Sequence, residues 1–124
     1  MAVLDLVSLR SGLFTSLIFS FNSSGNEYQE LYSFNDTLGK YPNASLCLSG
    51  GTLYGMTSQG GKYDYGSIFL IEKSGTGFKD LFDFNGSNGA LPNGSLVISG
   101  NLLYGMVKSG GLEGDGNIFK FNFK

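Results

Sequence analysis

Residues 53–61 read LYGMTSQGG, and residues 103–111 read LYGMVKSGG, nearly the same phrase 50 residues later. When residues 31–74 are set over 81–124 without gaps, 19 of the 44 pairs are identical. A period of this length is typical of proteins in which each copy is one small supersecondary unit that packs against its neighbours. The repeat therefore predicts a structural unit that is built more than once, and its glycines are expected to shape the backbone.

The same register continues upstream and then fails. Residues 16–35, set over 66–85, keep Ile18 and Phe19, whereas residues 1–15 share only Ser8 with the segment one period later. We therefore divide the chain into a degenerate or truncated N-terminal segment, 1–15, and one domain, 16–124, of about two 50-residue β-repeats.

Each period contains four short strand-like segments. Residues 95–99 and 102–108 flank Gly100-Asn101, a two-residue turn of the kind that closes tight hairpins. Residues 67–73 and 78–84 form a second pair around a glycine-containing turn, and residues 117–123 alternate apolar and polar side chains. Four antiparallel strands in about 50 residues predict an all-β fold of units that resemble β-propeller blades. The alternative is a β-solenoid or an open stack of meanders.

Composition excludes several classes of chemistry. The chain has no histidine and one cysteine, so histidine-based metal sites, Ser-His-Asp triads and internal disulfides are impossible. The net charge of −2 gives no basic surface for nucleic acid, and no apolar run is long enough for a membrane span. We expect no cofactor, no metal, no nucleic acid and no membrane span.

The repeated motif resembles the Gloeo/Verruco (GloVer) tandem repeat family of bacterial, often surface-anchored proteins. The residues that carry the resemblance are Leu53, Tyr54, Gly55, Gly60, Gly61, Gly66 and Phe69, with their partners Leu103, Tyr104, Gly105, Gly110, Gly111, Gly116 and Phe119. The resemblance implies a propeller-like β-repeat, suggests a secreted or cell-surface location, and transfers no activity. The chain departs from the family at 56–57 and 106–107, where relatives usually have threonines, and it shows no clear export signal or anchor.

The two copies diverge most at residues 62–65 and 112–115. Divergent loops of a repeat scaffold are where specificity usually lies. The candidates for ligand contact are therefore Tyr63, Asp64, Tyr65, Glu113 and Asp115. Ordinary solvated loops would show the same divergence.

These observations favour a non-enzymatic repeat module for protein or glycan binding or adhesion, or a structural scaffold. One alternative is a polysaccharide-directed hydrolase or lyase that uses the loop carboxylates, and another is a decayed or truncated gene product with no selected activity. Because two periods leave strand sets at both ends, a further copy of the chain is a predicted partner. Three chains would then supply six blades of a closed ring.

Overall fold

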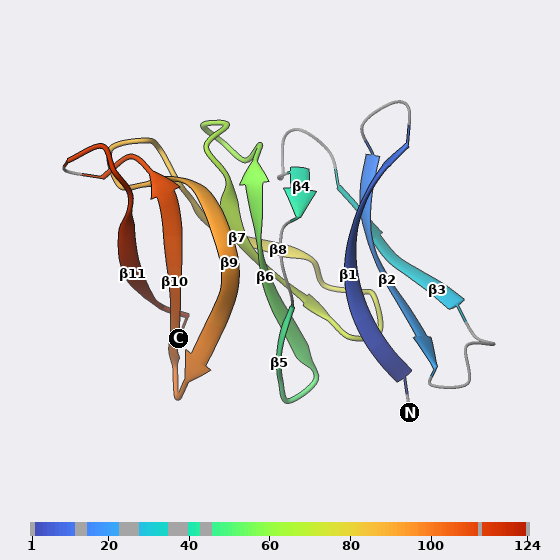
Figure 1. Cartoon of the computed structure of the whole chain (residues 1–124). Helices are drawn as coiled ribbons and strands as arrows, with labels where there is room; N and C mark the ends of the chain where they lie inside the picture. The colour runs from blue at the N-terminus through green and yellow to red at the C-terminus, as the bar shows by residue number, and fades with distance from the viewer. Residues whose placement is uncertain are drawn as a thin grey trace.

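A computed structural model of the chain describes residues 2–11, 15–22, 28–34, 40–42, 46–111 and 113–123, and these residues form three antiparallel sheets without a helix (Figure 1). The first sheet contains β1 (Ala2–Ser11), β2 (Thr15–Asn22) and β3 (Tyr28–Ser33). The middle sheet contains β4 (Lys40–Pro42), β5 (Cys47–Ser49), β6 (Thr52–Gln59), β7 (Ser67–Glu72) and β8 (Lys79–Asp83). The third sheet contains β9 (Ala90–Ser99), β10 (Leu102–Ser109) and β11 (Asn117–Asn122). The prediction of an all-β fold is confirmed.

The middle sheet represents the whole repeat unit. Its strands lie in the order β4-β6-β7-β8, and β5 also pairs with β6, so β4 and β5 together form the first of four strands. The third sheet has one continuous strand, β9, where the middle sheet has β4 and β5. The units are therefore blade-like, as predicted, and they stand side by side without closing into a ring (Figure 1).

The strand register is the same in all three sheets, including the part of the chain where the sequence repeat is lost. Gly55 lies opposite Phe69 between β6 and β7, and Gly105 lies opposite Phe119 between β10 and β11. Between β1 and β2, Asp5 lies opposite Phe19. Strand β1 therefore occupies the place of the Leu-Tyr-Gly strand, although its residues differ.

Two apolar cores lie between the three sheets, because side chains alternate across each strand. The first core, between the first and middle sheets, contains the buried residues Ile18, Leu31, Phe34, Leu53, Phe69 and Ile71. The second core, between the middle and third sheets, contains the buried residues Tyr54, Met56, Ile68, Phe84, Leu96, Leu103 and Val107. Each sheet of the pair contributes to each core, so the middle sheet is covered on both faces.

One aromatic contact is repeated at both sheet–sheet interfaces. The rings of Phe34 and Phe69 meet edge to face with centroids 5.2 Å apart and an interplanar angle of 67°. One period later the rings of Phe84 and Phe119 meet in the same way, at 5.4 Å and 63°. Because these are equivalent residues, the packing of one sheet on the next is itself a repeated structure.

Candidate functional site

The loop that joins β6 to β7 and the described residues of the loop that joins β10 to β11 have left-handed φ angles at the same positions. Equivalent φ angles are 79° at both Gly60 and Gly110, 80° and 81° at the next glycines, and 66° and 79° at Asp64 and Gly114. In each loop the last glycine donates its N–H to the carbonyl of the first glycine at 3.0 Å. Residues 62–65 and 113–115, which were predicted to differ in specificity, therefore differ in side chains while the loops keep the same left-handed backbone positions.

The three candidates in the β6–β7 loop have different surroundings. Tyr63 and Tyr65 expose 47% and 44% of their surface, and the Nζ atom of Lys62 lies 5.3 Å from the centre of the Tyr63 ring. The ring of Tyr65 packs over Gly86, where an added Cβ would lie 3.3 Å from its Cζ. Asp64 accepts a hydrogen bond from the N–H of Gly60 at 2.9 Å, and this bond holds the turn.

The candidates of the other loop, Glu113 and Asp115, are both exposed. The two loops lie at the same end of neighbouring sheets, and the connection that begins at Gly86 runs between them (Figure 1). Gly111 donates its N–H to the carbonyl of Gly86 at 3.1 Å, and Tyr65 packs on the same glycine. The structure thus links the loops through this connection. Among the described residues no group of three His, Cys, Asp or Glu could hold a metal ion.

A pair of carboxyl groups lies on β8 and was not predicted from the sequence. Asp80 lies opposite Phe69 on the face toward the first core, and its Oδ1 is buried without a hydrogen bond. Burial, with the neighbouring Asp83 carboxyl adding to the effect, raises the pKa of Asp80 from 3.8 to about 7. Asp83 Oδ1 accepts the backbone N–H of Lys62 at 3.1 Å. Asp83 therefore anchors the β6–β7 loop, and the pKa of its neighbour Asp80 lies near neutral pH.

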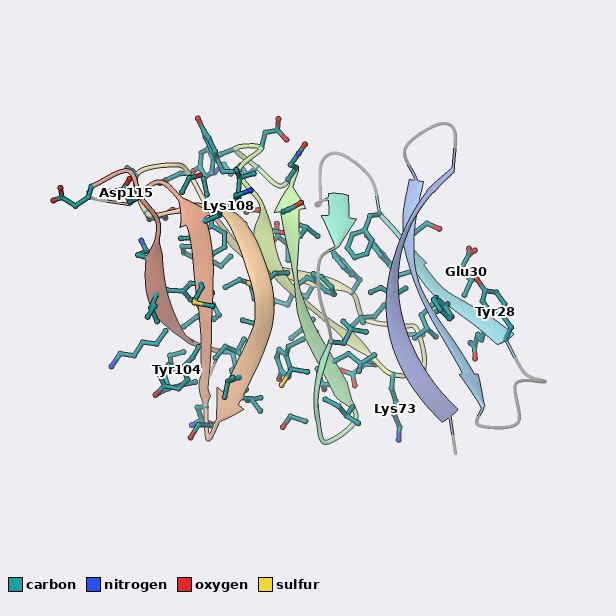
Figure 2. The ribbon with its side chains drawn as sticks, in the orientation of Figure 1. Tyr28, Glu30, Lys73, Tyr104, Lys108 and Asp115 are labelled. Atoms are coloured by element: carbon teal, nitrogen blue, oxygen red, sulfur yellow. The ribbon has the colours of Figure 1, made fainter. Side chains whose placement is uncertain are left out.

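The third sheet carries an apolar surface on the side away from the middle sheet. We call it the third-sheet outer face, and its apolar members Val97, Tyr104, Met106 and Ile118 are joined by Lys108 and Lys120. Cross-strand pairing places Tyr104 beside both Val97 and Lys120, and Met106 beside Ile118. Figure 2 shows Tyr104 projecting away from the other two sheets.

The same positions are buried one repeat earlier. Met56 and Ile68 are 2% and 0% exposed beneath the third sheet, whereas Met106 and Ile118 are 54% and 78% exposed. Tyr54 is likewise buried, with its ring 4.9 Å from that of Phe123, while Tyr104 is exposed. The third-sheet outer face therefore has the residues of a sheet–sheet interface, and no sheet formed by the described residues covers it. In the sequence, the feature that could have indicated this surface is the identity of its Tyr, Met and Ile residues in the two repeats.

A model of the Gloeobacter/Verrucomicrobia repeat family matches residues 15–124. The chain belongs to the Gloeobacter/Verrucomicrobia repeat family. The match confirms the resemblance that the sequence motif indicated. No curated protein and no solved structure matches the chain.

The Gloeobacter/Verrucomicrobia repeat match begins where β2 begins, so β1 lies outside it although its register is that of the repeat. No helix long and apolar enough to cross a membrane occurs in the portion of the chain that the structure describes. Family membership supports the organisation into repeats.

Proposed function

We propose that this Gloeobacter/Verrucomicrobia repeat protein is a non-enzymatic module that binds a protein partner through the third-sheet outer face. One observation carries the proposal. Tyr104, Met106 and Ile118 are exposed, although the equivalent residues of the middle sheet are buried under a neighbouring sheet. A monomeric protein rarely exposes a contiguous apolar surface of this kind unless a partner covers it.

The chemistry of this face fits a protein sheet better than a sugar. Val97, Met106 and Ile118 offer aliphatic and thioether surface, which gains free energy when it leaves water but forms no hydrogen bonds with hydroxyl groups. The face is also formed by three paired strands, and two sheets pack when their apolar side chains interdigitate. Lys108 and Lys120 add charge that would orient an acidic partner surface.

A second candidate function is glycan or peptide binding at the loops that join β6 to β7 and β10 to β11. The observation that favours it is the shared backbone frame, on which exposed Tyr63 and Tyr65 in one loop replace Glu113 and Asp115 in the other. Exposed aromatic rings are suited to stacking on sugars. Hydrolysis by the loop carboxylates is a weaker alternative, because Asp64 is engaged in its own turn.

The test compares immobilised wild-type protein with two variants and one control. The face variant is Met106→Asp with Ile118→Asp, the loop variant is Tyr63→Ala with Tyr65→Ala, and the control is Asn101→Asp in an exposed hairpin turn. Each immobilised protein is incubated with a mixture of extracellular proteins, and bound proteins are captured by chemical cross-linking. Each is also tested on a glycan array and against a panel of polysaccharides. The expected result is one bound protein that the wild type, the control and the loop variant retain. The face variant should lose it.

Three other results would contradict the proposal. A bound protein retained equally by the face variant would place binding elsewhere. Glycan binding lost only in the loop variant would support the second candidate. Polysaccharide cleavage abolished by Asp64→Asn or Glu113→Gln would assign an enzyme instead.

A further inference from the structure

We propose that the partner of the third-sheet outer face is the first sheet of a second copy of this chain, so that the chains associate head to tail. This inference rests on the proposed function, because it assigns an occupant to the same face. The opposite end of the molecule supplies the surface that it needs. Figure 2 shows Tyr28 and Glu30 on the side of the first sheet that faces away from the middle sheet.

The first-sheet outer face contains, among described side chains, Phe19, Tyr28, Glu30 and Ser33, and the Ser33 hydroxyl donates to Glu30 Oε1 at 3.4 Å. Ile18 is fully buried in the first core, so the adjacent Phe19 projects to the opposite side of β2. Glu30 lies opposite Phe19 across the β2–β3 ladder. Tyr28 is 61% exposed, and its ring stacks on that of Phe19. This end of the chain is thus another partly apolar sheet face.

The middle sheet uses the equivalent side chains to receive the sheet before it. Phe69 and Phe78, one period after Phe19 and Tyr28, stack at 5.5 Å with an interplanar angle of 22°. Phe19 and Tyr28 stack at the same 5.5 Å and at 29°. Phe78 also stacks on Tyr32 of the first sheet at 3.9 Å. The first sheet therefore presents, already assembled, the ring pair with which the middle sheet contacts its predecessor.

The chain contains this kind of interface twice. In both, the face of one sheet that looks toward the next repeat packs on the opposite face of the following sheet. The third-sheet outer face is the face that looks toward the next repeat, because its residues correspond to Tyr54, Met56 and Ile68. The first-sheet outer face is the opposite face, the one that receives the preceding repeat. Joining the two ends of different chains would continue the packing that already joins the sheets within one chain.

Charge selects this arrangement over a symmetric one. Lys108 and Lys120 lie on the third-sheet outer face, and Glu30 lies on the first-sheet outer face. The positions of the two lysines are occupied by Ser58 and Leu70 in the middle sheet, so the positive charge is specific to the exposed copy. Two third-sheet outer faces brought together would join two lysine-bearing faces, whereas the head-to-tail contact joins a lysine-bearing face to a glutamate-bearing one. A contact of this heterologous type forms a ring or an open row, depending on the rotation between copies.

The central experiment blocks one face at a time and then mixes the products. Ile118→Asp blocks the third-sheet outer face, and Tyr28→Asp blocks the first-sheet outer face. Molar mass is followed against concentration by sedimentation and light scattering. Wild type is expected to form concentration-dependent oligomers, whereas each variant alone stays monomeric because every contact requires both faces. An equimolar mixture of the two variants is expected to form a dimer and nothing larger, since it contains one intact contact.

A charge exchange gives a second readout with little loss of apolar surface. Chains with Lys108→Glu and Lys120→Glu, or with Glu30→Lys, carry like charges on both faces. Each is expected to associate at least about tenfold more weakly than wild type, with recovery on mixing because the faces become complementary again. Association of wild type should also weaken at high salt. Circular dichroism and melting curves matching those of Asn101→Asp would show that all variants fold.

The outcomes separate this inference from the proposed function. A wild type that is monomeric at every soluble concentration overturns the inference, and so does a Tyr28→Asp chain that still self-associates. If that monomeric wild type nevertheless retains another protein and loses it on Ile118→Asp, the proposed function stands alone. If the wild type neither self-associates nor retains any protein, both fall.

Discussion

Replacing Gly55 by alanine tests how the repeated motif holds each sheet together. An added Cβ would lie 2.7 Å from Cζ of Phe69, 3.1 Å from its Cε2 and 3.0 Å from Cδ2 of Leu46. The φ angle is not in the left-handed region at this position, so the glycine is required by the ring that lies over it. The aromatic ring that covers the glycine is thus the cross-strand phenylalanine, while Tyr54 points to the opposite core.

The Phe69 ring has little room to move. It is fully buried and contacts the rings of Phe34 and Phe78 at 5.2 and 5.5 Å. Forcing a methyl group into a packed core costs about 1–3 kcal/mol, mostly by displacing side chains from their preferred rotamers. For a domain of this size a loss of about 2 kcal/mol lowers the melting temperature by roughly 5–10 °C. Gly55→Ala should lie in this range.

Thermal and urea unfolding measure the effect, and two further substitutions define its cause. Gly51→Ala is the matched control, because nothing lies within 4 Å of a Cβ there and φ is not left-handed, and its stability should equal or slightly exceed that of wild type. In a Phe69→Leu background, Gly55→Ala should cost clearly less, since the smaller side chain leaves space. Equal stability of Gly55→Ala and Gly51→Ala would refute the reasoning, as would an undiminished cost in the Phe69→Leu background.

Thr57→Val should lower the free energy of unfolding by about 1–3 kcal/mol, because Ser67 would lose a buried hydroxyl contact of 2.8 Å and the acceptor of its N–H at 3.1 Å. Urea titration of Thr57→Val alone and combined with Ser67→Ala checks this, and the double variant should cost less than the sum. For Asp80, the folded-state pKa of about 7 exceeds the ordinary 3.8, so its stabilising contribution is full below pH 3.8 and disappears as the pH rises through 7. Asp80→Asn should therefore become more stable relative to wild type as the pH rises, by on the order of 1 kcal/mol at pH 8 after solvent screening. A difference in melting temperature between the two proteins that stays constant from pH 4 to 8 would contradict this. Asp64→Ala should cost about 1–2 kcal/mol in thermal melts, since alanine tolerates φ of 66° poorly and loses the side-chain bond, whereas Asp64→Gly should cost less, as Gly114 shows at the equivalent place.

The strands and turns of the repeat could be predicted because local chemistry determines them. The turn at 100–101 closes β9 onto β10, with φ of 58° at Gly100, and residues 117–123 contain β11 at 117–122. Strand β1 was harder to predict, since residues 1–15 retain one identical letter from the repeat. Its pairing with β2 keeps the register of the repeat, with Asp5 opposite Phe19, although the Leu-Tyr-Gly motif is absent.

Exposure and ionisation could not be predicted in the same way. Ile68 and Ile118 occupy the same place in the repeat, and only the presence of a sheet on one of them makes it buried. Asp80 corresponds to Glu30 in the preceding repeat, yet only Asp80 lies where another sheet covers its carboxyl oxygen. The exposure of a side chain and the pKa of a carboxyl both depend on the neighbouring sheet, so neither can be predicted from the sequence of one repeat.

The shared frame of the loops that join β6 to β7 and β10 to β11 has a consequence for how such a protein can change. Because the glycines at 60–61 and 110–111 and the left-handed residues at 64 and 114 fix the backbone, the side chains between them can vary without altering the fold. Each additional repeat would therefore add one more loop with variable side chains at the same end of the stack. Residues 62–65 of one unit should therefore be transplantable into 112–115 of the next, which would exchange the loop side chains without rebuilding a sheet.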